Sequence, residues 1–75
     1  MDPAEEELGE AAKAIVEILK ASPQPLTTRQ IGEEMAKRRK RCPDATIVFL
    51  NRLRRKGLIQ GRRDPERRGW VWWVD

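Results

Sequence analysis

Hydrophobic residues in the N-terminal part of the chain recur at steps of three and four, the spacing of one face of an α-helix. This stripe consists of Leu8, Ala11, Ala12, Ile15, Ile18 and Leu19. Asp2 can cap the helix, Pro3 suits its first position, and Glu5 has capping-box spacing from Asp2. Segment 22–25 contains two prolines, which cannot continue a helix without losing a backbone hydrogen bond. We therefore expect a helix over residues 3–21.

A second, shorter helix is indicated after Leu26, which can itself form a minimal strand. Thr27 and Gln30 have the spacing of a capping box, a motif that marks a helix start. The apolar face of this helix would consist of Ile31, Met35 and Ala36. Its last turn should fray into the basic run 37–41, Lys-Arg-Arg-Lys-Arg.

The third helix follows the dipeptide Cys42-Pro43. The proline disfavours a helical conformation in the residue before it, and Asp44 is a natural helix cap. We expect the helix to run from about Ala45 to Lys56, and its buried positions to be Phe49, Leu50 and Leu53. Gly57 then stands where helices commonly end in a left-handed conformation.

The last third of the chain has the pattern of a β-hairpin. Segment 58–60 begins a strand, and segment 70–74 is rich in valine and tryptophan, which strands favour. Between them, the charged loop 62–69 contains a turn-forming Asp-Pro and a closing glycine. Alternation along the second strand places Trp70 and Trp72 on one face and Val71 and Trp73 on the other. At least one tryptophan must then cover the small core.

The order helix, short strand, helix, helix and hairpin resembles the winged helix-turn-helix family. Segment 46–59, TIVFLNRLRRKGLI, is similar to the family's recognition helix and the start of its wing, and segment 25–31, PLTTRQI, resembles the approach to its second helix. The penicillinase-repressor and multiple-antibiotic-resistance regulator groups are the most similar in these features. The resemblance implies a mainly α fold with a small β-hairpin (α+β). It implies one domain over residues 1–75, with three helices and a C-terminal wing of two or three strands.

Positive charge is concentrated in the second half of the chain, although the net charge is only +4. Residues 1–21 carry six acids and two lysines, a local charge of −4. Residues 37–68 carry thirteen Lys or Arg and three acids, a local charge of +10. Such asymmetry predicts a surface that binds a polyanion, backed by an acidic outer helix. The plain alternative is a solvated surface on which arginine serves solubility.

The resemblance implies double-stranded DNA as the partner, with the third helix in the major groove. The expected base contacts are Ile47, Val48, Asn51 and Arg52; an asparagine can pair with adenine and an arginine with guanine. The expected contacts to the DNA backbone are Thr28, Arg29, Lys37, Arg38, Arg39, Lys40, Arg41, Arg54, Arg55 and Lys56. In the wing, residues 59–74, they are Arg62, Arg63, Arg67 and Arg68. Phosphate contacts position a protein and dominate its affinity without selecting a sequence.

Two apolar features leave other interpretations open. Ile47 and Val48 could contact thymine methyl groups or form a protein-binding patch. Alternatively the helix is rolled slightly, so that Ile47 packs inward and only Val48 is exposed. The tryptophans could cover the core beneath arginine stems, stack on single-stranded bases or join a homodimer. A protein-interaction module and a single-strand or RNA adaptor are therefore alternatives to duplex binding.

Catalytic and metal-binding chemistry is not indicated by the sequence. The chain has no histidine, and its one cysteine, Cys42, can form neither a structural zinc site nor an internal disulfide. The glycines are scattered, no apolar run approaches the roughly 18 residues of a membrane span, and the acidic N-terminus is unlike a secretion signal. We expect a protein that is not an enzyme and has no cofactor, metal, small-molecule ligand or membrane partner. We expect it in the cytoplasm, associated with the nucleoid, or in a nucleus.

Overall fold

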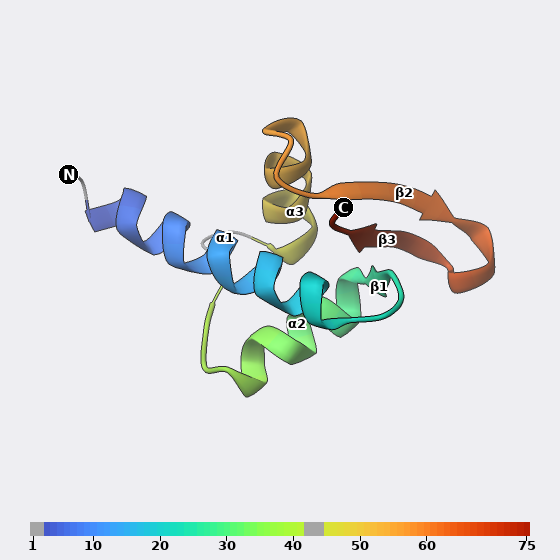
Figure 1. The fold of residues 1–75 in the computed structure, drawn as a ribbon, viewed down its shortest axis with the longest axis horizontal. Helices are drawn as coiled ribbons and strands as arrows, with labels where there is room; N and C mark the ends of the chain where they lie inside the picture. Colours follow the sequence, from blue (N-terminus) through green and yellow to red (C-terminus); the bar gives the residue numbers. More distant parts are fainter. Residues whose placement is uncertain (1–2, 42–44) are drawn as a thin grey trace.

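The computed structural model describes the backbone of residues 3–41 and 45–75, and the side chains of this part of the chain from residue 9 onward. Its helices are α1 (Pro3–Ala21), α2 (Thr28–Lys37) and α3 (Thr46–Arg55). Its strands are β1 (Leu26–Thr27), β2 (Gln60–Asp64) and β3 (Gly69–Trp73), and a 3-10 turn, η1 (Pro65–Arg67), joins the last two (Figure 1). The fold is α+β, as predicted, and its order of elements is compatible with a winged helix. The predicted roles of Asp2, Cys42, Pro43 and Asp44 lie outside the described residues.

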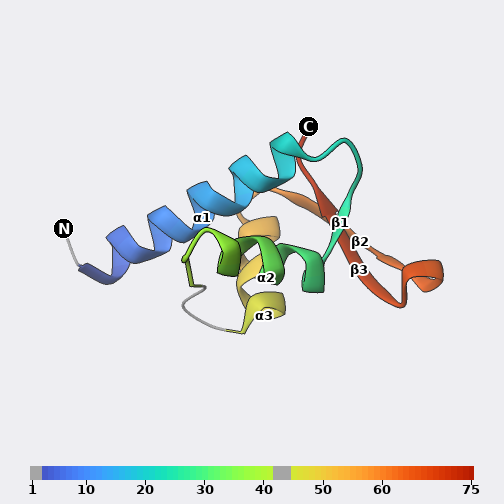
Figure 2. The same cartoon turned by 90° about the horizontal axis from the view of Figure 1, so that it is seen from below.

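The core lies between the three helices and one face of the sheet. It consists of Ala11, Ala14, Ile15, Ile18, Leu19, Ile31, Met35, Phe49, Leu50, Leu53, Ile59 and Trp72. The hairpin extends away from the helices on the side opposite the N-terminus (Figure 2). The prediction for Ala36 was wrong, because this residue is exposed. On the helix its side chain is turned about 140° from Ile31 and about 100° from Met35, the two buried residues.

The start of α2 and the C-terminal end of α3 have the predicted caps. The Thr27 hydroxyl accepts from the Gln30 amide at 3.2 Å, and the Thr27 amide donates to Gln30 Oε1 at 2.9 Å. At the C-terminal end of α3, Gly57 has a left-handed φ of 79°. The Leu58 amide donates to the Leu53 carbonyl at 3.1 Å, and the Gly57 amide donates to the Arg54 carbonyl at 3.0 Å. These two bonds form a Schellman motif, which ends α3 and turns the chain toward the wing.

The sheet is antiparallel with strand order β1-β3-β2. β2 begins at Gln60 rather than at residue 58, because the Schellman turn uses the preceding residues. The loop between β2 and β3 is shorter than predicted, because β2 continues to Asp64. The carboxylate of Asp64 accepts from the Glu66 amide at 3.0 Å. At the end of the turn Arg68 adopts the left-handed conformation, with a φ of 56°.

The predicted alternation of the tryptophans is confirmed. Trp72 is fully buried, and its indole nitrogen donates to the Thr28 hydroxyl at 3.0 Å. Trp70 stacks on it, with ring centroids 5.4 Å apart and an interplanar angle of 20°. Gly61 pairs with Trp72 across β2 and β3, and its missing side chain leaves room for the indole ring. The sheet is thereby fixed to the start of α2 and to the core.

Candidate nucleic-acid interface

The outward face of α3 is defined by the residues that it buries. Phe49, Leu50 and Leu53 are buried in the core. The opposite stripe, at steps of three and four, consists of Val48, Asn51, Arg52 and Arg55. Three of these four were predicted as base contacts, whereas Arg55 was assigned to the DNA backbone.

Ile47 lies away from this stripe. It is half-buried and packs against the core cluster, whereas Val48 is 49% exposed. The structure therefore has the rolled arrangement, in which only one of the two apolar residues faces solvent. Arg55 takes the outward position that the sequence analysis gave to Ile47. The sequence alone could have indicated that Ile47 packs inward, because on a helical wheel Ile47 lies 100° from Val48 and closer to the side that carries the buried residues.

Asn51 is half-buried and already has an intramolecular partner. Its Nδ2 donates to the Ile47 carbonyl at 3.1 Å, one turn back along α3. Bidentate pairing with adenine needs both the amide nitrogen and the amide oxygen. Asn51 must therefore rotate away from the helix backbone before it can read a base in this way.

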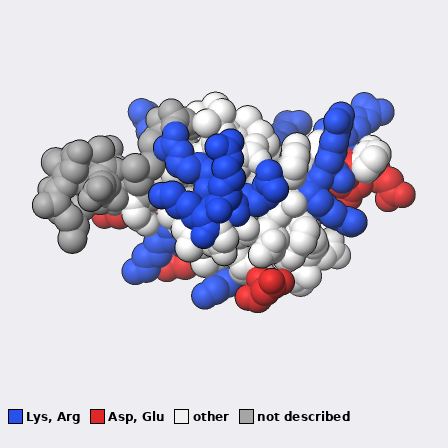
Figure 3. Space-filling view, turned by 90° about the horizontal axis from the view of Figure 1, so that it is seen from above, with Lys and Arg blue, Asp and Glu red and all other residues white. Residues whose placement is uncertain are grey.

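The C-terminal end of α3 is strongly basic. Its exposed cations are Arg52, Arg54, Arg55 and Lys56, and no acidic residue occurs between positions 45 and 63. The Arg54 guanidinium lies over the Trp70 ring, 5.1 Å from its centroid. This contact links the end of α3 to the root of the wing. Figure 3 shows Lys and Arg side chains gathered over this end of α3 and, separately, along the wing.

Arg62 and Arg63 project from opposite faces of the wing, because side chains alternate along a strand. Arg63 pairs with Trp70 across the hairpin and shares its face with the Arg54 contact. Arg62 pairs with Val71 and lines a shallow groove with Trp73 on the other face. Only Arg63 of the two therefore lies on the α3 side of the wing.

The two arginines that follow the turn also differ. Arg67 turns back onto the start of α2, where its Nη1 donates to the Pro25 carbonyl at 2.7 Å and its Nη2 to Gln30 Oε1 at 3.1 Å. Arg68 is exposed at the end of the wing. Arg67 was predicted as a DNA contact, but the structure gives its guanidinium partners within the protein.

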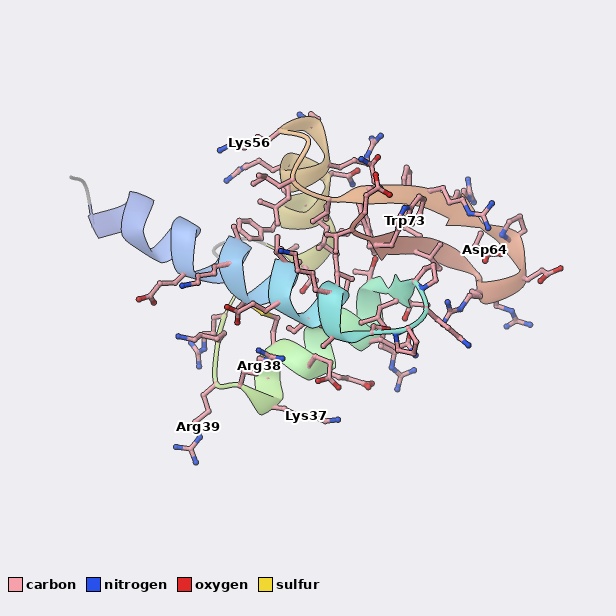
Figure 4. The ribbon with its side chains drawn as sticks, in the orientation of Figure 1. Lys37, Arg38, Arg39, Lys56, Asp64 and Trp73 are labelled. Atoms are coloured by element: carbon pink, nitrogen blue, oxygen red, sulfur yellow. The ribbon has the colours of Figure 1, made fainter. Side chains whose placement is uncertain are left out.

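The basic run after α2 is separate from the α3 cluster. In Figure 4, Lys37, Arg38 and Arg39 lie at one side of the molecule, and Lys56 lies at the opposite side. Three cations of this run form ion pairs with acids of α1 and α2: Lys37–Glu34 at 3.2 Å, Arg38–Glu17 at 3.6 Å and Lys40–Glu10 at 3.9 Å. Acidic side chains of α1 and α2 thus neutralise part of the positive charge that was predicted to contact DNA.

The start of α2 contributes little free positive charge. Arg29 forms an i,i+4 ion pair with Glu33 at 3.2 Å, and the Thr28 hydroxyl accepts from Trp72. Exposed pairs of this kind stabilise by about 0.3–0.5 kcal/mol, so a phosphate could compete for Arg29. The predicted backbone contacts therefore divide into a group around α3 and the wing, and a group near α1 and α2. In the second group the cations Arg29, Lys37, Arg38 and Lys40 are paired with the protein's own acids, whereas Arg39 and Arg41 are exposed without such a pair among the described residues.

Comparison of the chain with protein-family models, curated proteins and solved structures finds no match. Within residues 3–41 and 45–75, no helix is both long enough and apolar enough to cross a membrane. In the same part of the chain, no group of three or more His, Cys, Asp or Glu side chains is arranged to hold a metal ion.

Proposed function

We propose that this chain binds double-stranded DNA, with α3 in the major groove and the β2–β3 wing against the neighbouring backbone. The observation that carries the proposal is a set of cations without acidic partners. Among the described residues, Arg55, Lys56, Arg63 and Arg68 have no carboxylate within ion-pair distance. They lie around the outward face of α3 and on the wing, whereas three of the five cations in the run 37–41, namely Lys37, Arg38 and Lys40, are paired with glutamates.

The dimensions of α3 suit this role. An α-helix with its side chains is about 10–12 Å across, close to the roughly 12 Å width of the major groove. Val48 lies in the first turn of α3 and Asn51 near its middle, and the N-terminal part of this helix reads base edges in helix-turn-helix proteins. Val48 offers methyl groups to a thymine methyl, and Asn51 offers an amide to adenine. Arg55 and Lys56, at the other end, are placed for phosphates.

A protein-interaction module is the second candidate, and the exposed Val48 is the observation that favours it. The apolar surface around Val48 is small. Ile47 is half-buried, Trp72 is fully buried, and Trp70 is covered by Arg54 on one side and Trp72 on the other. Val48 and Leu58 are the large hydrophobic residues exposed in the described part of the chain, and they lie near opposite ends of α3. Isolated exposed apolar side chains are common on protein surfaces, which leaves duplex binding as the better-supported function.

Salt dependence tests the proposed function. A labelled mixed-sequence duplex should bind with a log–log salt slope of about −3.6, because each of the four cations that contacts a phosphate contributes about −0.9. Affinity should fall by about 150-fold between 50 and 200 mM salt. Fluorescence anisotropy measures both, and a single strand of the same sequence serves as the control and should bind more weakly. Absence of duplex binding at low salt would reject the proposal, and a preference for the single strand would favour the adaptor alternative.

A further inference from the structure

The tip of the wing is joined to the start of α2 by one side chain. Arg67 donates from Nη1 to the Pro25 carbonyl at 2.7 Å and from Nη2 to Gln30 Oε1 at 3.1 Å. These partners precede it by 42 and 37 residues. Hydrogen bonds from a charged donor are stronger than neutral ones, and two bonds from one planar guanidinium also fix its orientation.

The acceptor on Gln30 belongs to the cap of α2. Gln30 Oε1 also accepts from the Thr27 amide at 2.9 Å and from the Thr27 hydroxyl at 3.2 Å. The same oxygen therefore accepts the hydrogen bonds from Thr27 in the capping box and the hydrogen bond from Arg67 in the wing. If the Arg67 side chain is removed, Gln30 Oε1 keeps its two bonds from Thr27. The cap of α2 is then preserved and only the contact with the wing is lost.

The end of the wing has little other support. β1 pairs with β3 only at Trp72 and Val71, so the hairpin beyond Val71 is a two-stranded ribbon. No residue of η1 is buried. An isolated two-stranded hairpin is marginally stable in water at best. The Arg67 contact thus joins an otherwise weakly held segment to the helical core.

We propose that Arg67 is a positioning residue, which holds the wing against α2 so that Arg63 and Arg68 face the same DNA as α3. This inference rests on the proposed function, because it assigns Arg67 a role within the DNA-binding surface. Arg67 acts through hydrogen bonds inside the protein, and it contributes no phosphate contact of its own. It differs in this from Arg68, its neighbour in the chain.

The contact itself is tested in the free protein by a matched pair of substitutions that preserve charge. Arg67→Lys loses the planar two-bond geometry, so amide hydrogen exchange at residues 66–69 should accelerate by about tenfold, the effect expected for one charge-assisted hydrogen bond. Arg68→Lys should leave these rates unchanged. Unchanged exchange in Arg67→Lys, or equal acceleration in both variants, would overturn the proposed contact.

The positioning role is tested by the salt slope of duplex binding. Arg67→Gln should weaken binding several-fold at fixed salt and leave the slope within about 0.3 of the unmodified protein's value. Arg63→Gln, the control, should reduce the magnitude of the slope by about 0.9. An equal reduction in Arg67→Gln would make Arg67 a phosphate contact and overturn the inference. If the unmodified protein binds no duplex, the proposed function fails, whereas the exchange experiment still decides whether Arg67 holds the wing.

Discussion

Replacement of Arg55, Arg63 and Arg68 together by glutamine is expected to reduce duplex affinity by two to three orders of magnitude at about 0.1 M salt. These three cations lie on α3 and on the wing and have no acidic partner among the described residues. If each contacts one phosphate, the magnitude of the log–log salt slope should fall by about 2.7. Anisotropy titrations at several salt concentrations measure the affinity and the slope together.

The matched control removes the same charge elsewhere. Lys37, Arg38 and Arg39, also replaced by glutamine, belong to the run on the other side of the molecule, and two of them pair with glutamates. This variant should lose less than about tenfold in affinity and keep its slope nearly unchanged, since only long-range attraction is reduced. Equal losses in the two triple variants would mean that net charge alone drives binding, and that α3 and the wing form no defined interface.

Gly61→Ala is expected to destabilise the fold by about 3 kcal/mol, at the upper end of the usual range for overpacked cores. A Cβ atom at this position would lie 2.4 Å from Cε3 and 2.6 Å from Cζ3 of Trp72. The indole cannot move aside easily, because it is fully buried and bonded to Thr28. For a domain of this size the expected fall in Tm is about 15 °C. Thermal and urea unfolding followed by circular dichroism measure the change.

Gly69→Ala is the control for this prediction. Gly69 lies on the partner strand of the same hairpin, and a Cβ atom there has nothing within 4 Å. Its substitution should change the free energy of unfolding by no more than about 0.5 kcal/mol. If both alanine variants were equally stable, the close packing of Trp72 on Gly61 would be contradicted. If both were equally destabilised, the cause would be glycine's role in the strands.

Local sequence patterns predicted the elements and most of the core. The prolines of segment 22–25 fixed the end of α1, the Thr27–Gln30 spacing fixed the start of α2, and Gly57 marked the end of α3. These features act over a few residues, so a single sequence contains them in full. Alternation likewise placed Trp70 and Trp72 on one face, although which of them is fully buried required the structure.

The division of the basic residues could not be predicted in the same way, because it depends on contacts between distant segments. The pairing of Arg38 and Lys40 with glutamates of α1 follows from the packing of α1 beside α2. The opposite orientations of Arg62 and Arg63 follow from alternation, but the face that meets α3 follows from the register of the hairpin. Arg67 finds its partners some 40 residues back along the chain. A local charge count treats all these cations alike.

The central claim is that duplex DNA binds to α3 and to the α3 side of the wing, and backbone amide chemical-shift mapping tests it most directly. The ¹⁵N-labelled protein would be titrated with a mixed-sequence duplex at low salt. The largest shifts are expected at Val48, Asn51, Arg55, Arg63 and Arg68, with little change at Lys37 and Arg39. Shifts centred on residues 37–41, or spread evenly over all exposed cations, would contradict the proposed interface.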